Sequence, residues 1–208
     1  NSYLSTVNRD VYPIDEYPYG QWDYMFFYLD NFELVLEQME EDLEKFLAIT
    51  FRRPSEETIS MFNTAEGYKS PTALITKNGG WFRQDSYQGL NTMPEIKFDE
   101  KIFSDEKAKF YLDTFKKNGL RGPNSWYMNG TKNDDYAKEL GGFTTISKPV
   151  LFIAGENDSV LTPETNSHNA MACTNLTEKS LPTGHWMAME KPDEVNQALS
   201  SWIQKNFS

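Results

Sequence analysis

Hydrophobic residues recur every three or four positions along residues 29–53, and this spacing predicts one long helix. The apolar positions are Phe32, Val35, Leu36, Met39, Leu43, Phe46 and Leu47. At 3.6 residues per turn they share one face, which we expect to pack against a core. Pro54 ends this helix, and a short second helix is predicted at 55–61.

Stop and start signals mark two more helices. Ser104 is a predicted N-cap, and Gly119 is the predicted stop of a helix between them. The stretch that follows, NGLRGPNSWYMNG, is rich in glycine and proline and is predicted to be a loop. A polar helix is predicted at 134–140, so the region from about residue 24 to residue 142 is predicted to be helical.

The pattern changes after Gly142. A short apolar run in KPVLFIAGEND predicts a strand buried on both faces of a parallel sheet. A helix near Thr162-Pro163, a weaker strand at 178–181 and a helix at 192–207 complete an α/β pattern. The last helix places Val195, Leu199, Trp202 and Ile203 on one face. Two or three parallel strands cannot cover themselves, so we expect this to be half of a larger fold.

Composition narrows the classes of partner. The 208 residues are 38% hydrophobic and 14% aromatic, as in globular proteins, and no apolar run reaches the roughly 18 residues of a membrane span. The formal net charge of −11 disfavours nucleic acid and anionic membrane surfaces, so a neutral or apolar partner is expected. Sequons at Asn129 and Asn175 would permit glycosylation, so secretion is possible and the cytoplasm is only slightly favoured.

Few residues could bind a metal ion. The chain has one cysteine, Cys173, and two histidines, His168 and His185. His168 lies in a polar stretch and is expected to be a solvated surface residue. We therefore predict no metal, no cofactor and no internal disulfide.

An acid and a histidine follow consecutive predicted strands. Asp158 follows the apolar strand in GENDSV, and His185 follows the next strand in LPTGHWM. Carboxyl ends of parallel strands meet at one edge of a sheet, where a carboxylate can orient an imidazole as a general base. Taken singly, Asp158 could cap a turn and His185 could be a satisfied core residue.

A nucleophile for this base is missing from the sequence. No two glycines lie four residues apart, so the glycine-flanked nucleophile turn of α/β-hydrolases is absent, and no histidine precedes a glycine. The start, NSYLSTVNRD, has neither an initiator methionine nor the pattern of a signal peptide, so we expect a segment of something longer.

Several motifs resemble the α/β-hydrolase-fold epoxide hydrolases of the soluble type. GENDSV resembles their acid turn, GHWMAMEKPDEVNQAL their histidine loop and last helix, and FKKNGLRGPNSWY their lid segment. The resemblance implies an α/β fold made of the helical lid and C-terminal half only. It divides the chain into a connection from the missing core half at 1–22, a lid at 23–143 and a core part at 144–208.

The family implies roles for particular residues. Its two catalytic lid tyrosines correspond to Tyr127 and Tyr28, with Tyr24 as a rival for the second position. Asp158 and His185 correspond to the acid and the base that activates water. The residues beside them, Trp186, Val160 and Leu161, are expected to line the apolar part of the pocket.

The resemblance also implies what the chain acts on and with. The substrate is expected to be a small apolar epoxide, and a complementary N-terminal part is expected to supply the nucleophilic aspartate and the oxyanion loop. Two alternatives remain open. A haloalkane or haloacid dehalogenase of the same fold would need halide-binding groups in place of paired tyrosines, and a binding subunit would lack turnover.

Overall fold

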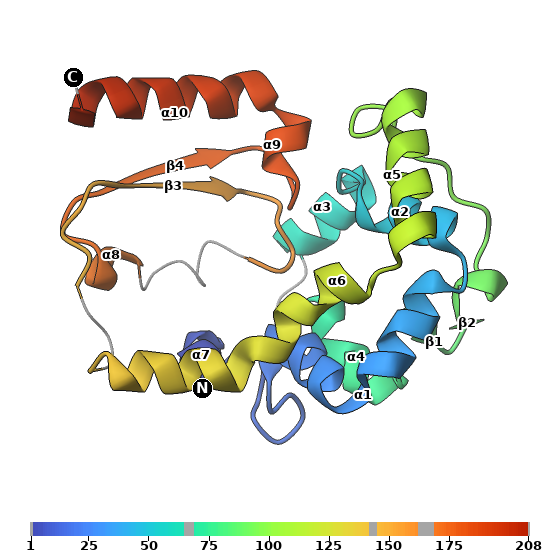
Figure 1. Cartoon of the computed structure of the whole chain (residues 1–208). Coiled ribbons are helices and arrows are strands. Elements are labelled where there is room, and N and C mark those ends of the chain that lie inside the picture. Colours follow the sequence, from blue (N-terminus) through green and yellow to red (C-terminus); the bar gives the residue numbers. More distant parts are fainter. Residues whose placement is uncertain (1, 65–68, 142–144, 162–168, 208) are drawn as a thin grey trace. The chain divides into compact units, whose positions relative to one another are not determined.

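The computed structural model describes residues 2–64, 69–141, 145–161 and 169–207, which fall into two compact units (Figure 1). The first unit comprises Asn1–Arg52 and Lys69–Asp134, and the second comprises Arg53–Tyr68 and Asp135–Ser208. Among the described residues, no helix is long and apolar enough to cross a membrane. The same residues hold no group of three or more potential metal ligands.

The first unit is largely helical. Its helices are α1 (Asp23–Glu40), α2 (Leu43–Thr50), α4 (Ile75–Asn78), α5 (Asp105–Asn118) and α6 (Arg121–Asn124), with 3-10 turns η1 (Ser2–Thr6), η2 (Gly20–Trp22), η3 (Pro71–Leu74), η4 (Leu90–Thr92) and η5 (Ser125–Asn129). Strands β1 (Arg83–Gln84) and β2 (Tyr87–Gln88) form a small antiparallel hairpin that the sequence pattern did not predict. Helix α7 (Gly130–Glu139) follows η5, so the predicted polar helix begins earlier than expected.

The single helix predicted at 29–53 is wrong, because the structure has two helices there. Helix α1 begins at Asp23, bends where Asn31 leaves helical geometry, and ends at Glu40. The side chain of Asp42 then accepts the backbone N–H of Lys45 at 3.0 Å and caps α2. An N-cap aspartate starts a new helix because its oxygen satisfies a first-turn donor.

The ends of α5 are confirmed, whereas the loop predicted after it is helical. Ser104 Oγ accepts the N–H of Lys107 at 3.4 Å, and Gly119, at φ +69°, closes the helix. The chain then enters α6 and η5, which together carry Tyr127. Pro123 is compatible with α6 because it lies in the first turn, where its missing N–H is not needed.

The core of the first unit lies between α1, α2 and the segments that cross them. Its buried residues are Phe27, Tyr28, Val35, Leu36, Met39, Phe46, Leu47, Ile75, Leu90 and Leu120. The apolar face predicted for residues 29–53 therefore does pack against a core, although it is divided between two helices.

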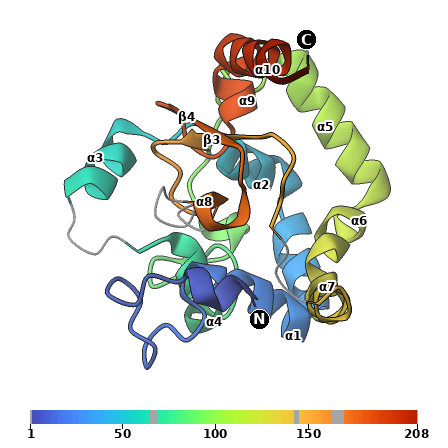
Figure 2. The same ribbon diagram turned by 90° about the vertical axis from the view of Figure 1, so that its left-hand side faces the viewer.

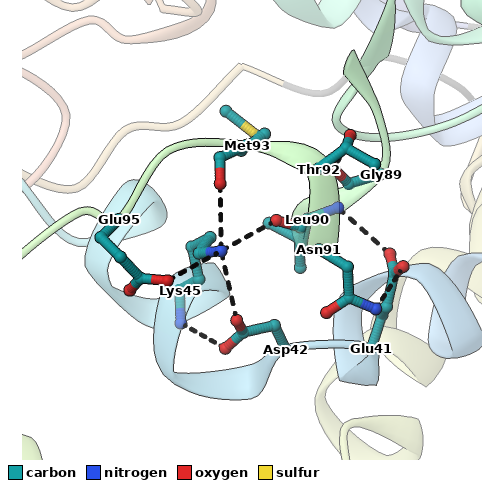
Figure 3. Close-up of polar contacts among 9 residues, drawn as sticks. All are labelled: Glu41, Asp42, Lys45, Gly89, Leu90, Asn91, Thr92, Met93 and Glu95. Carbon is teal, nitrogen blue, oxygen red and sulfur yellow. Dashed lines mark hydrogen bonds and ion pairs between the residues drawn. The ribbon is translucent and has the colours of Figure 1, made fainter.

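A buried lysine holds the segment after β2 against α2 (Figure 3). Lys45 is 5% exposed and donates to the carbonyl oxygens of Leu90 at 3.0 Å and Met93 at 3.2 Å. Its ammonium also lies 3.5 Å from Asp42 and 3.6 Å from Glu95. A buried charge is tolerated when it is paired and hydrogen-bonded in this way.

The C-terminal end of α1 anchors three separate loops. Each of three polar side chains accepts a backbone N–H from a different segment: Gln38 from Trp81 at 2.8 Å, Glu40 from Leu120 at 2.6 Å, and Glu41 from Leu90 at 3.1 Å. Helix α1 therefore carries Tyr28 and also fixes the start of the segment that carries Tyr127.

The second unit contains a parallel strand pair, as predicted. Strand β3 (Val150–Gly155) pairs with β4 (Leu176–Leu181) in a register that joins Val150 to Leu176. Helix α10 (Pro192–Phe207) runs along one face of this pair, as Figure 1 and Figure 2 show. Three shorter helices belong to the described part of this unit: α3 (Glu56–Thr64), α8 (Asn169–Ala172) and α9 (Met187–Glu190). The helix predicted near Thr162-Pro163 and the prediction for His168 lie outside the described residues.

Candidate active site

The structure brings Asp158 and His185 into direct contact beyond the carboxyl ends of β3 and β4. Asp158 Oδ2 lies 2.8 Å from His185 Nδ1. The acid is 3% exposed, whereas the histidine side chain is 44% exposed. Because Nδ1 is engaged by the carboxylate, the other ring nitrogen, Nε2, is the one left for a substrate or water.

The second oxygen of Asp158 is held by its own turn. Asp158 Oδ1 accepts the backbone N–H groups of Val160 at 2.9 Å and Leu161 at 3.0 Å. Val160 and Leu161 were expected to line a pocket. In the structure, their backbone N–H groups orient the carboxylate of Asp158. Both side chains are at least partly exposed.

Backbone contacts fix the acid turn against the histidine loop. The N–H of Asn157 donates to the carbonyl of Thr183 at 2.9 Å. Gly155 permits this approach, because a Cβ there would lie 2.9 Å from the same Thr183 oxygen. A glycine is therefore required where the two strand ends meet.

The contact shifts the pKa of both groups. Burial tends to raise the pKa of Asp158, but the hydrogen bond and charge of His185 and the two backbone N–H groups outweigh it, and the net pKa is lowered. The hydrogen bond to Asp158 raises the pKa of His185 against the opposing effect of burial, and the charges of Asp158 and Glu190 add to the rise. Each partner thus favours the charged form of the other.

Trp186 follows the histidine and packs beside it. The two rings are perpendicular, with centroids 5.0 Å apart. Trp186 is partly buried and precedes the first residue of α9. Its large apolar surface next to the imidazole suits the predicted contact with an apolar substrate.

The predicted lid tyrosines lie together in the first unit. The rings of Tyr28 and Tyr127 are 5.0 Å apart, and Tyr24 lies 5.8 Å from Tyr28 and 5.5 Å from Tyr127. Tyr28 is 2% exposed. Burial, followed by the nearby Tyr127 and Tyr24, raises its pKa well above the ordinary value, so its hydroxyl keeps its proton at neutral pH. The geometry places both Tyr28 and Tyr24 next to Tyr127.

Trp81, which no sequence pattern singles out, joins this ring cluster. Its ring lies 6.0 Å from that of Tyr24 and 6.3 Å from that of Tyr28. Its indole nitrogen is buried, and hydrogen bonding by this side chain partly opposes the rise in the pKa of Tyr28. Gly79, at φ +73°, and Gly80, at φ +132°, precede it and mark a tight turn, but no spacing rule connects that turn with Tyr28.

The strand pair, its acid turn and its histidine loop form part of an α/β-hydrolase fold, as the likeness to solved structures shows. Epoxide hydrolase A from Mycobacterium thermoresistibile superposes with a TM-score of 0.65 at 22% identity, covering 87% of this chain and 51% of that chain. A mutant epoxide hydrolase of Vigna radiata gives 0.60 at 20% identity, covering 95% and 58%.

Sequence comparisons identify the family more narrowly, although no family profile matches the chain. Bifunctional epoxide hydrolase 2 of Mus musculus is 34% identical over 182 residues, which are 84% of this chain and 29% of that protein. Epoxide hydrolase A of Mycobacterium tuberculosis is 35% identical over 116 residues, or 55% and 36% respectively. The chain belongs to the α/β-hydrolase-fold epoxide hydrolases and spans less than a third of the bifunctional relative's length.

Proposed function

We propose that this chain is the lid and histidine-bearing part of an epoxide hydrolase that converts a small apolar epoxide to a vicinal diol. The nucleophilic aspartate and the oxyanion loop come, in this proposal, from a complementary N-terminal part. That part is either a preceding segment of the same polypeptide or a separate chain.

The first step opens the ring. The aspartate carboxylate attacks a ring carbon, the carbon–oxygen bond breaks, and the oxygen takes a proton from a lid tyrosine. Tyr28 and Tyr127 serve as the two donors, because phenols aimed at the oxygen stabilise the negative charge that develops there. The product of this step is an ester between the aspartate and the substrate.

The second step hydrolyses the ester. His185 takes a proton from water, and the resulting hydroxide attacks the ester carbonyl. Collapse of the intermediate breaks the ester bond, and the imidazolium returns its proton to the departing alkoxide. The proton released as the aspartate carboxylate re-forms restores the tyrosine, so the sum is epoxide plus water to diol.

The paired tyrosine rings are the observation that supports epoxide chemistry over other reactions of the fold. Tyr28 and Tyr127 lie 5.0 Å apart, and they come from segments about a hundred residues apart in the sequence. A buried phenol with a raised pKa is a neutral donor, which is what a developing alkoxide requires. An acid-oriented histidine alone would fit an esterase equally well.

Tyrosine-to-phenylalanine variants of the full-length protein test this proposal. Tyr127→Phe and Tyr28→Phe should slow ester formation by roughly ten- to a thousandfold, the scale of losing one oxyanion donor, and should slow ester hydrolysis less. Single-turnover kinetics separate the two steps. Tyr24→Phe, measured alongside, decides which tyrosine of α1 is the second donor.

The matched control is Tyr111→Phe, which removes a hydroxyl from a ring that packs with Phe103 in another aromatic group of the same unit. It should leave both steps unchanged. Parental ester formation in Tyr127→Phe would refute the donor assignment. Halide release from a haloalkane would instead favour a dehalogenase, and no turnover of either substrate would favour a binding subunit.

A further inference from the structure

A glutamate on the helix after the histidine loop holds the backbone next to His185. Both carboxylate oxygens of Glu190 lie 3.0 Å from the backbone nitrogen of Gly184. The N–H therefore donates to a charged acceptor, which gives a stronger hydrogen bond than a neutral acceptor would. Gly184 immediately precedes His185.

The surroundings of Gly184 leave this backbone little freedom. A Cβ at residue 184 would lie 2.6 Å from Pro54 Cδ and 3.2 Å from Glu190 Oε1. On the preceding side, the buried Thr183 is held by Asn157 of the acid turn. The carboxylate of Glu190 thus holds Gly184, and the acid turn holds the residue before it.

The turn that presents Glu190 is itself tied to the histidine loop. The backbone N–H groups of Met189 and Glu190 donate to the carbonyl of Trp186 at 2.8 and 2.9 Å. Glu190 therefore returns to Gly184 over a closed turn of seven residues that contains His185. Because the turn is short and closed, the position of the Glu190 carboxylate constrains the position of the His185 imidazole.

The charge of Glu190 also acts on the histidine. Among the described residues, the charged groups that raise the pKa of His185 are Asp158 from the acid turn and Glu190 from α9. A second anion near the imidazole stabilises the imidazolium that forms when the base takes a proton from water.

We propose that Glu190 is a positioning residue for the base: its carboxylate fixes the Gly184 backbone, and its negative charge supports that of Asp158 in stabilising the protonated His185. The catalytic part of this role rests on the proposed function, in which His185 activates water. The contact with Gly184 and the effect on the imidazole do not depend on which substrate is turned over.

Three substitutions of Glu190 separate charge from hydrogen bonding. Glu190→Gln keeps an acceptor for Gly184 but removes the charge. Glu190→Ala removes both, and Glu190→Asp keeps the charge on a shorter side chain. The control is Glu194→Gln, which removes a carboxylate four residues later that pairs with Lys191 at 3.3 Å.

Nuclear magnetic resonance of the full-length protein measures both effects directly. A His185→Gln variant assigns the signal of His185, because only that signal disappears, and His168, the other histidine of these 208 residues, serves as the internal reference. Glu190→Gln should lower the pKa of His185 and leave that of His168 in place. In Glu190→Ala the Gly184 amide should in addition exchange with solvent about five- to tenfold faster, because it has lost its acceptor.

Kinetics add a third readout. In the Gln and Ala variants, ester hydrolysis should slow, by up to about a hundredfold for Ala, while ester formation stays at the parental rate. If Glu190 acted only as a hydrogen-bond acceptor for Gly184, the isosteric Gln variant would match the parent in His185 pKa, Gly184 exchange rate and ester hydrolysis. An unchanged His185 pKa in a folded Glu190→Gln protein, or an unchanged Gly184 exchange rate in Glu190→Ala, would overturn the proposal. Failure to turn over an epoxide would instead refute the proposed function and leave these two measurements decisive for Glu190.

Discussion

At the scale of single residues, the two oxygens of Asp158 have different partners. One accepts two backbone N–H groups of its own turn, and the other contacts His185 at 2.8 Å. The turn therefore fixes the acid whether or not the histidine is charged. The interaction with His185 then depends on pH, because it is strongest when the carboxylate is ionised and the imidazole is protonated.

Asp158→Asn should remove stability in a defined range of pH. The lowered pKa of Asp158 contributes stability above the ordinary value of 3.8, which is lost as the pH falls through the lowered pKa. The raised pKa of His185 contributes stability below 6.5, which is lost as the pH rises through the raised pKa. The melting temperatures of parent and variant should therefore differ most between pH 3.8 and 6.5, and the difference should narrow as the pH rises through the raised pKa of His185, where the contribution of Asp158 alone remains.

The contact between Asp158 and His185 also predicts how Asp158→Asn changes the kinetics. The substitution removes the anion that orients His185, so ester hydrolysis should slow while ester formation persists and the ester accumulates. Trapping the ester by mass spectrometry measures this directly. A melting difference that is independent of pH, or parental steady-state turnover, would contradict the role assigned to Asp158.

Single-residue chemistry was partly predictable from the sequence. Asp158 and His185 could be paired because both follow strands that lie side by side in a parallel sheet, and that placement needs no side-chain detail. Trp81 and Glu190 could not be found in this way. The contact of Trp81 with Tyr28 and that of Glu190 with Gly184 depend on how loops fold back in three dimensions. Neither Trp81 nor Glu190 belongs to a periodic pattern.

At the scale of elements, α1 links the two predicted tyrosine donors. Tyr28 lies on α1, and Tyr127 lies on η5, which follows α6. Glu40, at the end of α1, accepts the backbone N–H of Leu120 at 2.6 Å, immediately before α6. This helix-to-loop contact joins the helix that carries Tyr28 to the start of the segment that carries Tyr127.

Glu40→Ala should weaken this link. The buried Leu120 would keep its N–H without an acceptor, and we expect a loss of about 1 kcal/mol in the free energy of unfolding. Because η5 would then be held less firmly, ester formation should slow as well. Urea denaturation and single-turnover kinetics measure the two effects.

Two variants complete that experiment. Glu40→Gln keeps an acceptor for Leu120 and should behave nearly as the parent does. Glu37→Ala removes an exposed carboxylate from the same helix and should change neither quantity. If Glu40→Ala and Glu37→Ala have the same stability and rate, the contact does not position Tyr127.

Element boundaries show where periodicity is a poor guide. Leu43, Phe46 and Leu47 continue the apolar spacing of α1, so the pattern hid the break that Asp42 introduces by capping α2. In residues 119–129 the glycines and Pro123 favoured a loop, yet contacts made by α1 and the side chain of Asn124, which donates to the Leu120 carbonyl at 3.0 Å, support a helical turn. A local helix cap overrode the apolar spacing in the first place, and tertiary contacts overrode local propensity in the second.

At the scale of the whole molecule, the second unit has a small sheet. Its described residues form one parallel pair, β3 and β4, and parallel strands are normally covered on both faces and flanked by further strands. On α10, Leu199 and Ile203 are 43% and 46% exposed although they belong to its apolar face. These surfaces fit the proposal that a complementary N-terminal part completes the sheet.

Expression of residues 1–208 by themselves tests this proposal. We expect the isolated chain to aggregate or to bind a hydrophobic dye, and to melt over a broad range, because apolar faces and a strand edge lack their partners. Supplying the complementary part, in the same polypeptide or as a second chain, should abolish dye binding and give one sharp transition at a higher temperature. The measurement compares dye fluorescence and calorimetric unfolding of both forms at equal concentration. A monodisperse isolated monomer that unfolds cooperatively without binding the dye would show that the two units need no further sheet, and the half-enzyme hypothesis would then be wrong.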